Sequence, residues 1–261
     1  MNWKRVTALA VSEALSLTRN KDAVRTGFRV LLYHTVGTRL AHDRYGISIE
    51  PRLFEQHMEI LESCGQHLQL AAFDDSLIFA ARLPLCVAVT FDDGYKENLH
   101  VAAPILLKRN IPFTVFVTSS FVGKSSDGYL SAAELKELSA LPNVTIGAHG
   151  ATHVRLAECD DATLQRELIE SRRRIEDIIE RPVTTVSYPH GSVNLRVRAA
   201  AAQAGYATGG CSRCDINEAN RDRLLLNRCE IVAGDSARVF KQKLYGAWDW
   251  YRWRTADPAS A

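Results

Sequence analysis

The chain has almost no net charge and no long run of apolar residues. Its 261 residues include 32 Lys or Arg and 30 Asp or Glu, which leaves a formal charge of +2 at pH 7. Without a basic excess to neutralise phosphates, a nucleic-acid-binding protein is disfavoured. No apolar stretch is long enough to span a bilayer. Internal repeats and low-complexity segments are also lacking, and a hydrophobic content of 46% predicts one domain with a sizeable core.

The N-terminal segment lacks the marks of a cleaved secretion signal. Lys4 and Arg5 precede a short apolar run, but Ser12 and Glu13 interrupt it and no clear small-residue cleavage site follows. We therefore expect residues 1–27 to form an uncleaved helical segment. A protein without a signal peptide is expected to be cytoplasmic.

Only one Cys-x-x-Cys pair, Cys211 and Cys214, occurs among the six cysteines. Because no second pair follows at zinc-ribbon spacing, two incidental thiols in a loop are favoured over a redox or structural-metal site. All six are compatible with a reducing compartment, in which they serve as small apolar residues or free thiols. The other four are Cys64, Cys86, Cys159 and Cys229.

Patterns typical of strands and helices alternate along the chain. Apolar runs predict strands at residues 28–33, 85–90, 112–117, 144–148, 183–187 and 224–231. Helices are predicted at residues 51–64, 98–108, 132–138, 162–179 and 195–204. Ser131 and Glu134 have the spacing of a capping box at the start of the third helix. This alternation predicts a parallel sheet or barrel with its functional site at the carboxyl ends of the strands.

Two adjacent aspartates, Asp92 and Asp93, follow one of these apolar runs and precede Gly94. Like charges at the end of a buried strand are costly unless a cation or a proton transfer uses them. Taken alone, the Asp-Asp-Gly sequence is equally compatible with a solvated turn, because Asp and Gly are ordinary turn residues.

A histidine pair downstream favours the functional interpretation. His149 and His153 are spaced so that both imidazoles can meet one ion, and a carboxylate would complete a facial set with open positions for water. The His-x-x-x-His spacing alone is weak evidence. Together with the aspartates, it indicates a mononuclear hydrolytic metal site.

Three segments of the chain resemble the first three motifs of the polysaccharide deacetylases, also called carbohydrate esterase family 4 or the NodB homology family. The segments are residues 90–95, 147–153 and 187–191. The resemblance implies a distorted (β/α)7 barrel over residues 28–232, with Asp92 as general base and Asp93, His149 and His153 as ligands of a divalent metal. It also implies that the backbone amide of His190 donates to the oxyanion. Such a ligand set suits Zn²⁺, and Co²⁺ or Ni²⁺ could substitute.

The chain departs from the family pattern at two positions. Ser187 stands where family members carry an arginine that pairs with the catalytic Asp, and no histidine follows His190 to act as the late general acid. His34, at the end of the first predicted strand, resembles that late motif moved to the N-terminus, as in a permuted branch that de-N-acetylates surface polysaccharides. First and last strands of a closed barrel are neighbours, so either chain end can supply the acid.

Arg228, on the last predicted strand, is the candidate for the missing arginine. Alternatives remain open for both replacements. His34 is equally compatible with a strand-end histidine whose ring bonds the backbone, and Arg228 with a surface arginine.

The resemblance implies removal of an N-acetyl or other N-acyl group from an amino sugar in a glycan or lipid-linked saccharide. In that reaction the metal polarises the carbonyl, Asp92 takes a proton and His34 protonates the leaving amine. Two alternatives on the same scaffold are deformylation of a lipid-linked amino sugar and hydrolysis of a cyclic amide. A non-catalytic carbohydrate-binding relative is an alternative of another class. His42 with Asp43 is a further possible ligand pair, but a polar loop favours solvated or substrate-facing side chains.

All four tryptophans lie near the ends of the chain, Trp3 in the first segment and the others within residues 233–261. Tryptophan and tyrosine mixed with lysine and arginine are typical of a membrane interface. That interpretation places the protein at the inner membrane face, acting on a polyprenyl-linked sugar. The alternative, which we favour slightly, is that both ends pack together as a helical lid under the barrel. The tail contains Trp248, Trp250 and Trp253.

Overall fold

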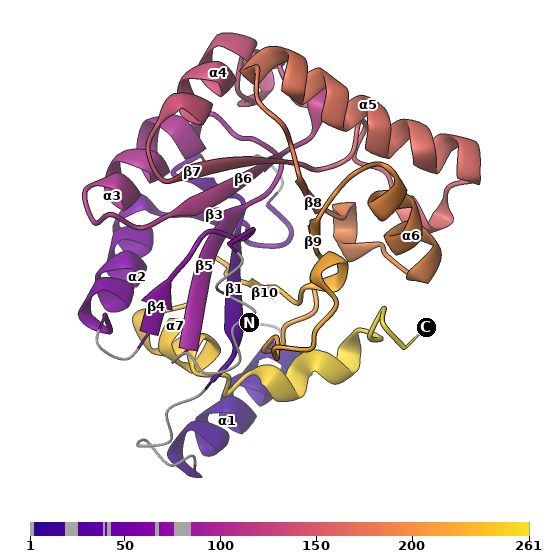
Figure 1. The fold of residues 1–261 in the computed structure, drawn as a ribbon. Helices are drawn as coiled ribbons and strands as arrows, with labels where there is room; N and C mark the ends of the chain where they lie inside the picture. Colours follow the sequence, from indigo (N-terminus) through magenta and orange to yellow (C-terminus); the bar gives the residue numbers. More distant parts are fainter. Residues whose placement is uncertain are drawn as a thin grey trace.

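A curled parallel sheet forms the centre of the protein in the computed structural model, which describes residues 3–18, 26–38, 40, 43–65, 68–75 and 85–260. Its strands follow the order β10-β1-β5-β6-β7-β8-β9, and β4 pairs with the first half of β5 (Figure 1). The sheet curls into a half-barrel, which is the distorted (β/α)7 fold predicted for the chain. The strands are β1 (Phe28–Tyr33), β4 (Leu68–Leu70), β5 (Leu85–Phe91), β6 (Phe113–Val117), β7 (Val144–Ala148), β8 (Thr185–Ser187), β9 (Thr208–Gly210) and β10 (Cys229–Glu230). A separate pair joins β2 (Thr35–Val36) to β3 (Ser48–Ile49).

Successive side chains of each strand point to opposite faces of the sheet, and the helices cover the outer face. Outward residues such as Leu31, Val89 and Val115 join one large apolar core with residues of the helices. Inward residues such as Val30 and Phe116 form a smaller cluster inside the half-barrel. The helices are α2 (Pro51–Ser63), α3 (Ala103–Leu107), α4 (Ala132–Ala140), α5 (Asp161–Ile179), α6 (Leu195–Gln203) and α7 (Ala237–Leu244).

Strand β1 lies between the last strand of the chain and β5. Leu31 pairs with Cys229 on one side and with Val89 on the other. An isolated bridge from Gly210 to Leu226 brings the far edge of the sheet toward the same region. The first and last strands are therefore neighbours, as expected for a barrel.

Most predicted elements are confirmed, and the capping box is present, with the amide of Glu134 donating to Ser131 Oγ. The strand predicted at residues 224–231 is wrong over most of its length. Arg223–Leu225 forms a 3-10 turn because Asp222 Oδ1 accepts the amide of Leu224 at 2.8 Å, and pairing to β1 begins only at Cys229. The helix predicted at residues 98–108 begins as a π-helical turn, Asn98–Ala102.

The two ends of the chain pack together beneath the barrel, where helix α1 (Trp3–Thr18) lies beside the C-terminal segment (Figure 1). Trp248 is buried against Ala8, and Trp250 Nε1 donates to Ser12 Oγ at 3.0 Å. This is the lid arrangement, although Trp253 remains 71% exposed and the side chain of Trp3 lies outside the described part. Among the helices that the structure describes, none combines the length and apolar character needed to cross a membrane.

Candidate active site

The predicted site residues converge at the carboxyl ends of the strands. Asp92 directly follows β5, His149 follows β7, Ser187 ends β8 and His34 follows β1. Parallel strands bring these ends to one edge of the sheet. Arg228 precedes β10, and its buried side chain passes over the ring of Phe116 to reach the same edge.

Asp93, His149 and His153 form a compact group whose ligand atoms all lie within 4.8 Å of one another. Asp93 Oδ1 lies 3.4 Å from His149 Nε2 and 3.2 Å from His153 Nε2. His149 Nδ1 lies 2.9 Å from the carbonyl oxygen of Ser187. A proton on Nδ1 completes that hydrogen bond and leaves the Nε2 lone pair directed toward Asp93.

This group fits a divalent metal. Asp93 Oδ1 is buried but accepts no hydrogen bond of ordinary geometry from the described residues, which is unusual for a buried carboxylate. Two imidazole nitrogens with one carboxylate oxygen suit Zn²⁺, and three protein ligands with an open position are typical of catalytic rather than structural zinc. The structure thus brings together the three predicted ligands.

Asp92 has a different environment from its neighbour. Arg228 donates to it through both arms of the guanidinium, Nη1 to Oδ1 and Nη2 to Oδ2, each at 2.8 Å. Ser187 Oγ donates to Asp92 Oδ2 at 3.0 Å and accepts from Arg228 Nη2 at 2.7 Å. The predicted replacement for the missing arginine therefore does contact Asp92, with Ser187 bridging the pair.

The charges explain which groups are ionised. Burial alone would raise the pKa of Asp92, but Arg228 and the neighbouring imidazoles outweigh it and hold that pKa well below its usual range. Burial likewise opposes ionisation of Asp93, yet His153, His34 and His149 lower its pKa. Burial lowers the pKa of His149 to about 4, so its imidazole is neutral at neutral pH, as metal binding requires.

His34 and His190 flank this group. His34 is half-buried, and no described residue bonds its Nδ1. Tyr33 pairs with Phe91 in the parallel register, so His34 lies beside Asp92 at the ends of β1 and β5. The His190 ring lies 4.5 Å from the His153 ring. His190 adopts a positive φ of 57° within a tight turn, which is uncommon for a residue with a side chain and fixes the direction of its backbone.

The sequence does not predict the roles of two residues in the site. Ser187 departs from the family pattern, yet its side chain bridges Asp92 and Arg228. Glu167, on α5, is buried and accepts hydrogen bonds from the loop between His149 and His153. A signal was present, because position 167 lies beside the apolar stripe of the amphipathic helix, where a carboxylate is out of place.

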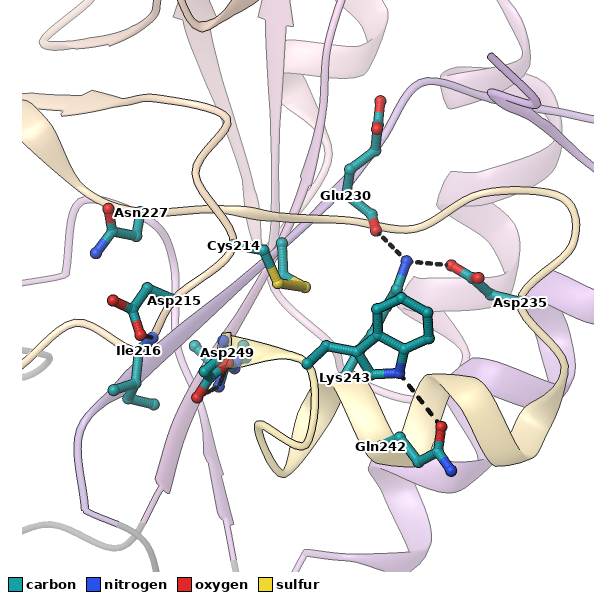
Figure 2. Close-up of a disulfide and its surroundings, with 12 residues drawn as sticks. Cys214, Asp215, Ile216, Asn227, Glu230, Asp235, Gln242, Lys243 and Asp249 are labelled. Carbon is teal, nitrogen blue, oxygen red and sulfur yellow. Dashed lines mark hydrogen bonds and ion pairs between the residues drawn. A yellow bond between two sulfur atoms is a disulfide. The ribbon is translucent and has the colours of Figure 1, made fainter. Parts of the chain in front are cut away.

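The expectation of six free thiols is wrong for two of them. Cys214 and Cys229 form a disulfide, which Figure 2 draws with the contacts of Lys243 to Glu230 and Asp235. Cys211, the other half of the Cys-x-x-Cys pair, is buried and free, and its carbonyl accepts from Arg228 Nε at 3.0 Å. Pairing with Cys229 follows from the adjacency of the Cys214 loop to β10, which spacing does not reveal.

The second candidate ligand pair gains no support from the described part of the chain. His42 lies outside the described residues. Both oxygens of Asp43 accept backbone amides, from Ile47 and Ser48, each at 2.9 Å. The Asp43 carboxylate therefore orders its own loop.

Comparisons with known proteins agree with the fold and the motifs. Residues 82–209 match the family model for polysaccharide deacetylases. The chain is 25% identical over 213 residues to YxkH of Bacillus subtilis (strain 168), a protein named as a polysaccharide deacetylase, and the match covers 81% of this chain and 74% of the relative.

Two solved structures share the fold. One is the Streptococcus pyogenes deacetylase PplD in complex with acetate, with 22% identity and a TM-score of 0.72 over 84% of this chain and 98% of that one. The other is BC0361, a polysaccharide deacetylase from Bacillus cereus, with 24% identity and a TM-score of 0.73 over 84% of this chain and 69% of that one. With its three motifs at the strand ends of this fold, the part of the chain that matches the family model, residues 82–209, belongs to the polysaccharide deacetylase family.

Proposed function

We propose that the protein is a metal-dependent hydrolase that removes an N-acetyl or other N-acyl group from an amino sugar in a glycan or lipid-linked saccharide. The observation that carries the proposal is the pairing of two unlike aspartates. Asp93 lies with His149 and His153 in a metal-ligand geometry, while the adjacent Asp92 is held apart by Arg228. One carboxylate is thereby available to a cation and the other to a proton.

A divalent cation held by Asp93, His149 and His153 would polarise the acyl carbonyl and make water more acidic. Asp92 takes the proton released when water attacks the carbonyl carbon. Arg228 keeps this carboxylate ionised and fixed in orientation, and Asp92 Oδ2 lies 3.7 Å from His149 Nε2, at the edge of the ligand group. A fixed base beside the attacking water is what general base catalysis requires.

The remaining steps fall to His190 and His34. The backbone amide of His190 donates a hydrogen bond to the oxyanion that forms on the acyl oxygen. His34 then donates a proton to the amine nitrogen as the C–N bond breaks. Two observations support this role: no described residue bonds Nδ1 of His34, and the strand register places His34 beside Asp92. Supply of the acid by His34, directly after β1, is the arrangement expected for the permuted branch, and Arg228, directly before β10, stands in for the missing arginine.

A product assay tests the proposal. Zinc-loaded protein is incubated with N-acetylated and N-formylated amino-sugar oligomers and with cyclic amides, and the released acids are measured. Acetate release by the wild type, lost in a His149→Ala, His153→Ala double variant, supports a deacetylase. Formate release or ring opening in its place assigns one of the two alternative amide hydrolyses. Saccharide binding without any release would identify a non-catalytic carbohydrate-binding relative.

We further propose a peripheral membrane contact through α1, which would bring a polyprenyl-linked sugar to the site. Ala10, Val11 and Leu17 lie on an exposed side of this helix, with Val11 37% and Leu17 72% exposed, whereas Ser12 faces inward. Exposed apolar residues on a helix whose sequence includes Lys4 and Arg5 suit an anionic lipid surface.

Vesicle co-sedimentation tests this contact. The wild type should sediment with anionic phosphatidylglycerol vesicles, and a Val11→Asp, Leu17→Asp variant should not. The packing of Trp248 and Trp250 into the lid limits any aromatic contribution to Trp253. Equal sedimentation of both proteins, or of neither, would leave α1 as a structural lid only.

A further inference from the structure

Glu167 on α5 inserts a buried carboxylate into the loop that joins the two histidines of the candidate metal site. Its side chain is nearly inaccessible, with 3% of the residue exposed. Oε2 accepts the backbone amides of Ala151 and Thr152 at 2.8 and 2.9 Å, and Oε1 accepts the Thr152 hydroxyl at 2.5 Å. Three hydrogen bonds to one carboxylate hold this loop to α5.

The loop needs such support because its backbone is unusual. Gly150 has a φ of +71°, and His153, which is not a glycine, has a φ of +64°. Ser171, one helical turn after Glu167, donates from Oγ to the Gly150 carbonyl at 2.9 Å. A left-handed conformation at a histidine persists only when its surroundings enforce it. The direction of the His153 ring therefore depends on the contacts with α5.

The charge of Glu167 is as notable as its geometry. Among the ion pairs in the described part of the chain, none involves Glu167. A buried carboxylate without a basic partner is costly unless another positive charge compensates it. The charge of Glu167 acts on His153, at the other end of the same loop, and a cation held by Asp93, His149 and His153 would supply positive charge at that place.

We propose that Glu167 is a positioning residue for the metal site, which sets the loop conformation that aims His153 and adds negative charge that favours a divalent cation. This inference rests on the metal site of the proposed function and does not depend on the substrate. Carboxylates outside the ligand shell commonly change metal affinity by about 10- to 100-fold when removed.

Zinc affinity, measured by competition with a chromophoric chelator, tests the role of Glu167. Glu167→Gln preserves the shape, because its amide oxygen can accept both backbone amides and its NH₂ can donate to the Thr152 hydroxyl, while the charge is lost. Glu167→Ala removes charge and contacts together. Glu170→Gln, on the exposed side of the same helix, is the matched control.

We expect Glu167→Ala to weaken zinc binding by about 10- to 100-fold, Glu167→Gln to weaken it by a smaller factor, and Glu170→Gln to leave it unchanged. Unchanged zinc affinity in Glu167→Gln would overturn the charge contribution, and unchanged affinity in a folded Glu167→Ala would overturn the whole inference. If Glu167→Ala does not fold, the zinc affinity of Glu167→Gln tests the inference, and an unchanged affinity overturns it. A wild type that binds zinc but releases no acyl group would contradict the proposed function alone.

Discussion

Arg228 and Asp92, 136 residues apart in the sequence, meet in the site through two parallel hydrogen bonds of 2.8 Å, and Arg228 is completely buried. The planar fork of a guanidinium matches the two oxygens of a carboxylate, so this contact fixes orientation as well as charge. Arg228 directly precedes β10, which pairs with β1, so the region where the last strand joins the first supplies part of the site.

Removing the guanidinium should destabilise the fold as well as impair the reaction. Arg228→Met leaves a buried carboxylate without its partner, which typically costs about 3–5 kcal/mol of unfolding free energy. Urea unfolding measures the loss, and Arg198→Met is the matched control, because the partly exposed Arg198–Asp222 pair should contribute about 1 kcal/mol or less. Equal losses in the two variants would contradict a buried, energetically coupled Arg228–Asp92 pair.

The two aspartates should respond differently to the same substitution. Asp92→Asn should keep the metal and lose most of the rate, about 100-fold or more, because a general base is removed. Asp93→Asn should lose metal affinity, because a ligand oxygen is replaced by a poorer one. Metal content and turnover are measured on the same samples. Equal metal loss in both variants would show that the two roles are assigned wrongly.

His34 should affect the release of the amine. His34→Ala should lower turnover most at the lower pH values, where the wild-type imidazolium can donate its proton, and should flatten the alkaline limb of the pH–rate profile, because that limb reports loss of the proton from the general acid. Zinc affinity should be unchanged, since His34 is not in the ligand group. A variant with the wild-type pH profile would transfer the role to another group or to water.

The fold should lose stability in acid, in part through His57. This histidine is buried, its ring is stacked on that of Phe240 with 4.3 Å between the centroids, and its Nε2 is hydrogen-bonded to the Asp235 carbonyl. Burial lowers its pKa from 6.5 to about 4, so the unfolded chain binds the proton more readily than the folded one. The neutral His57 contributes about 3 kcal/mol to the free energy of unfolding. This contribution is complete above about pH 6.5 and falls as the pH drops toward 4.

Unfolding of metal-free protein at several pH values checks this prediction. His149, whose pKa is also lowered to about 4, contributes in the same window. His57→Gln retains a donor toward the Asp235 carbonyl but cannot titrate, so its stability should fall less steeply between pH 6.5 and 4. An unchanged slope in that variant would contradict the buried neutral state of His57.

The sequence was sufficient where the chemistry is local. Asp92, Asp93, His149 and His153 stand in short motifs directly after apolar runs, and parallel strands gather such ends at one edge. Arg228 and His34 could be predicted as site residues because a barrel places its first and last strands side by side. Their proximity to Asp92 is confirmed, whereas their catalytic roles stay predictions.

Other features depend on contacts that no local pattern records. Glu167 meets the histidine loop only after α5 packs on the barrel, and Cys214 meets Cys229 only because their segments are neighbours in space. The apolar residues 224–226 resembled a strand. Leu226 instead fills the interior of the half-barrel, and Asp222 turns the chain just before it.

The proposed amide hydrolysis depends on a metal held by Asp93, His149 and His153. The most direct measurement is acetate release from N-acetylated amino-sugar oligomers by chelator-stripped protein as zinc is added back. We expect no turnover in the stripped protein and full recovery at about one zinc per chain, as a mononuclear site requires. Full activity in stripped protein that retains no metal, or no recovery when zinc is bound, would contradict the account.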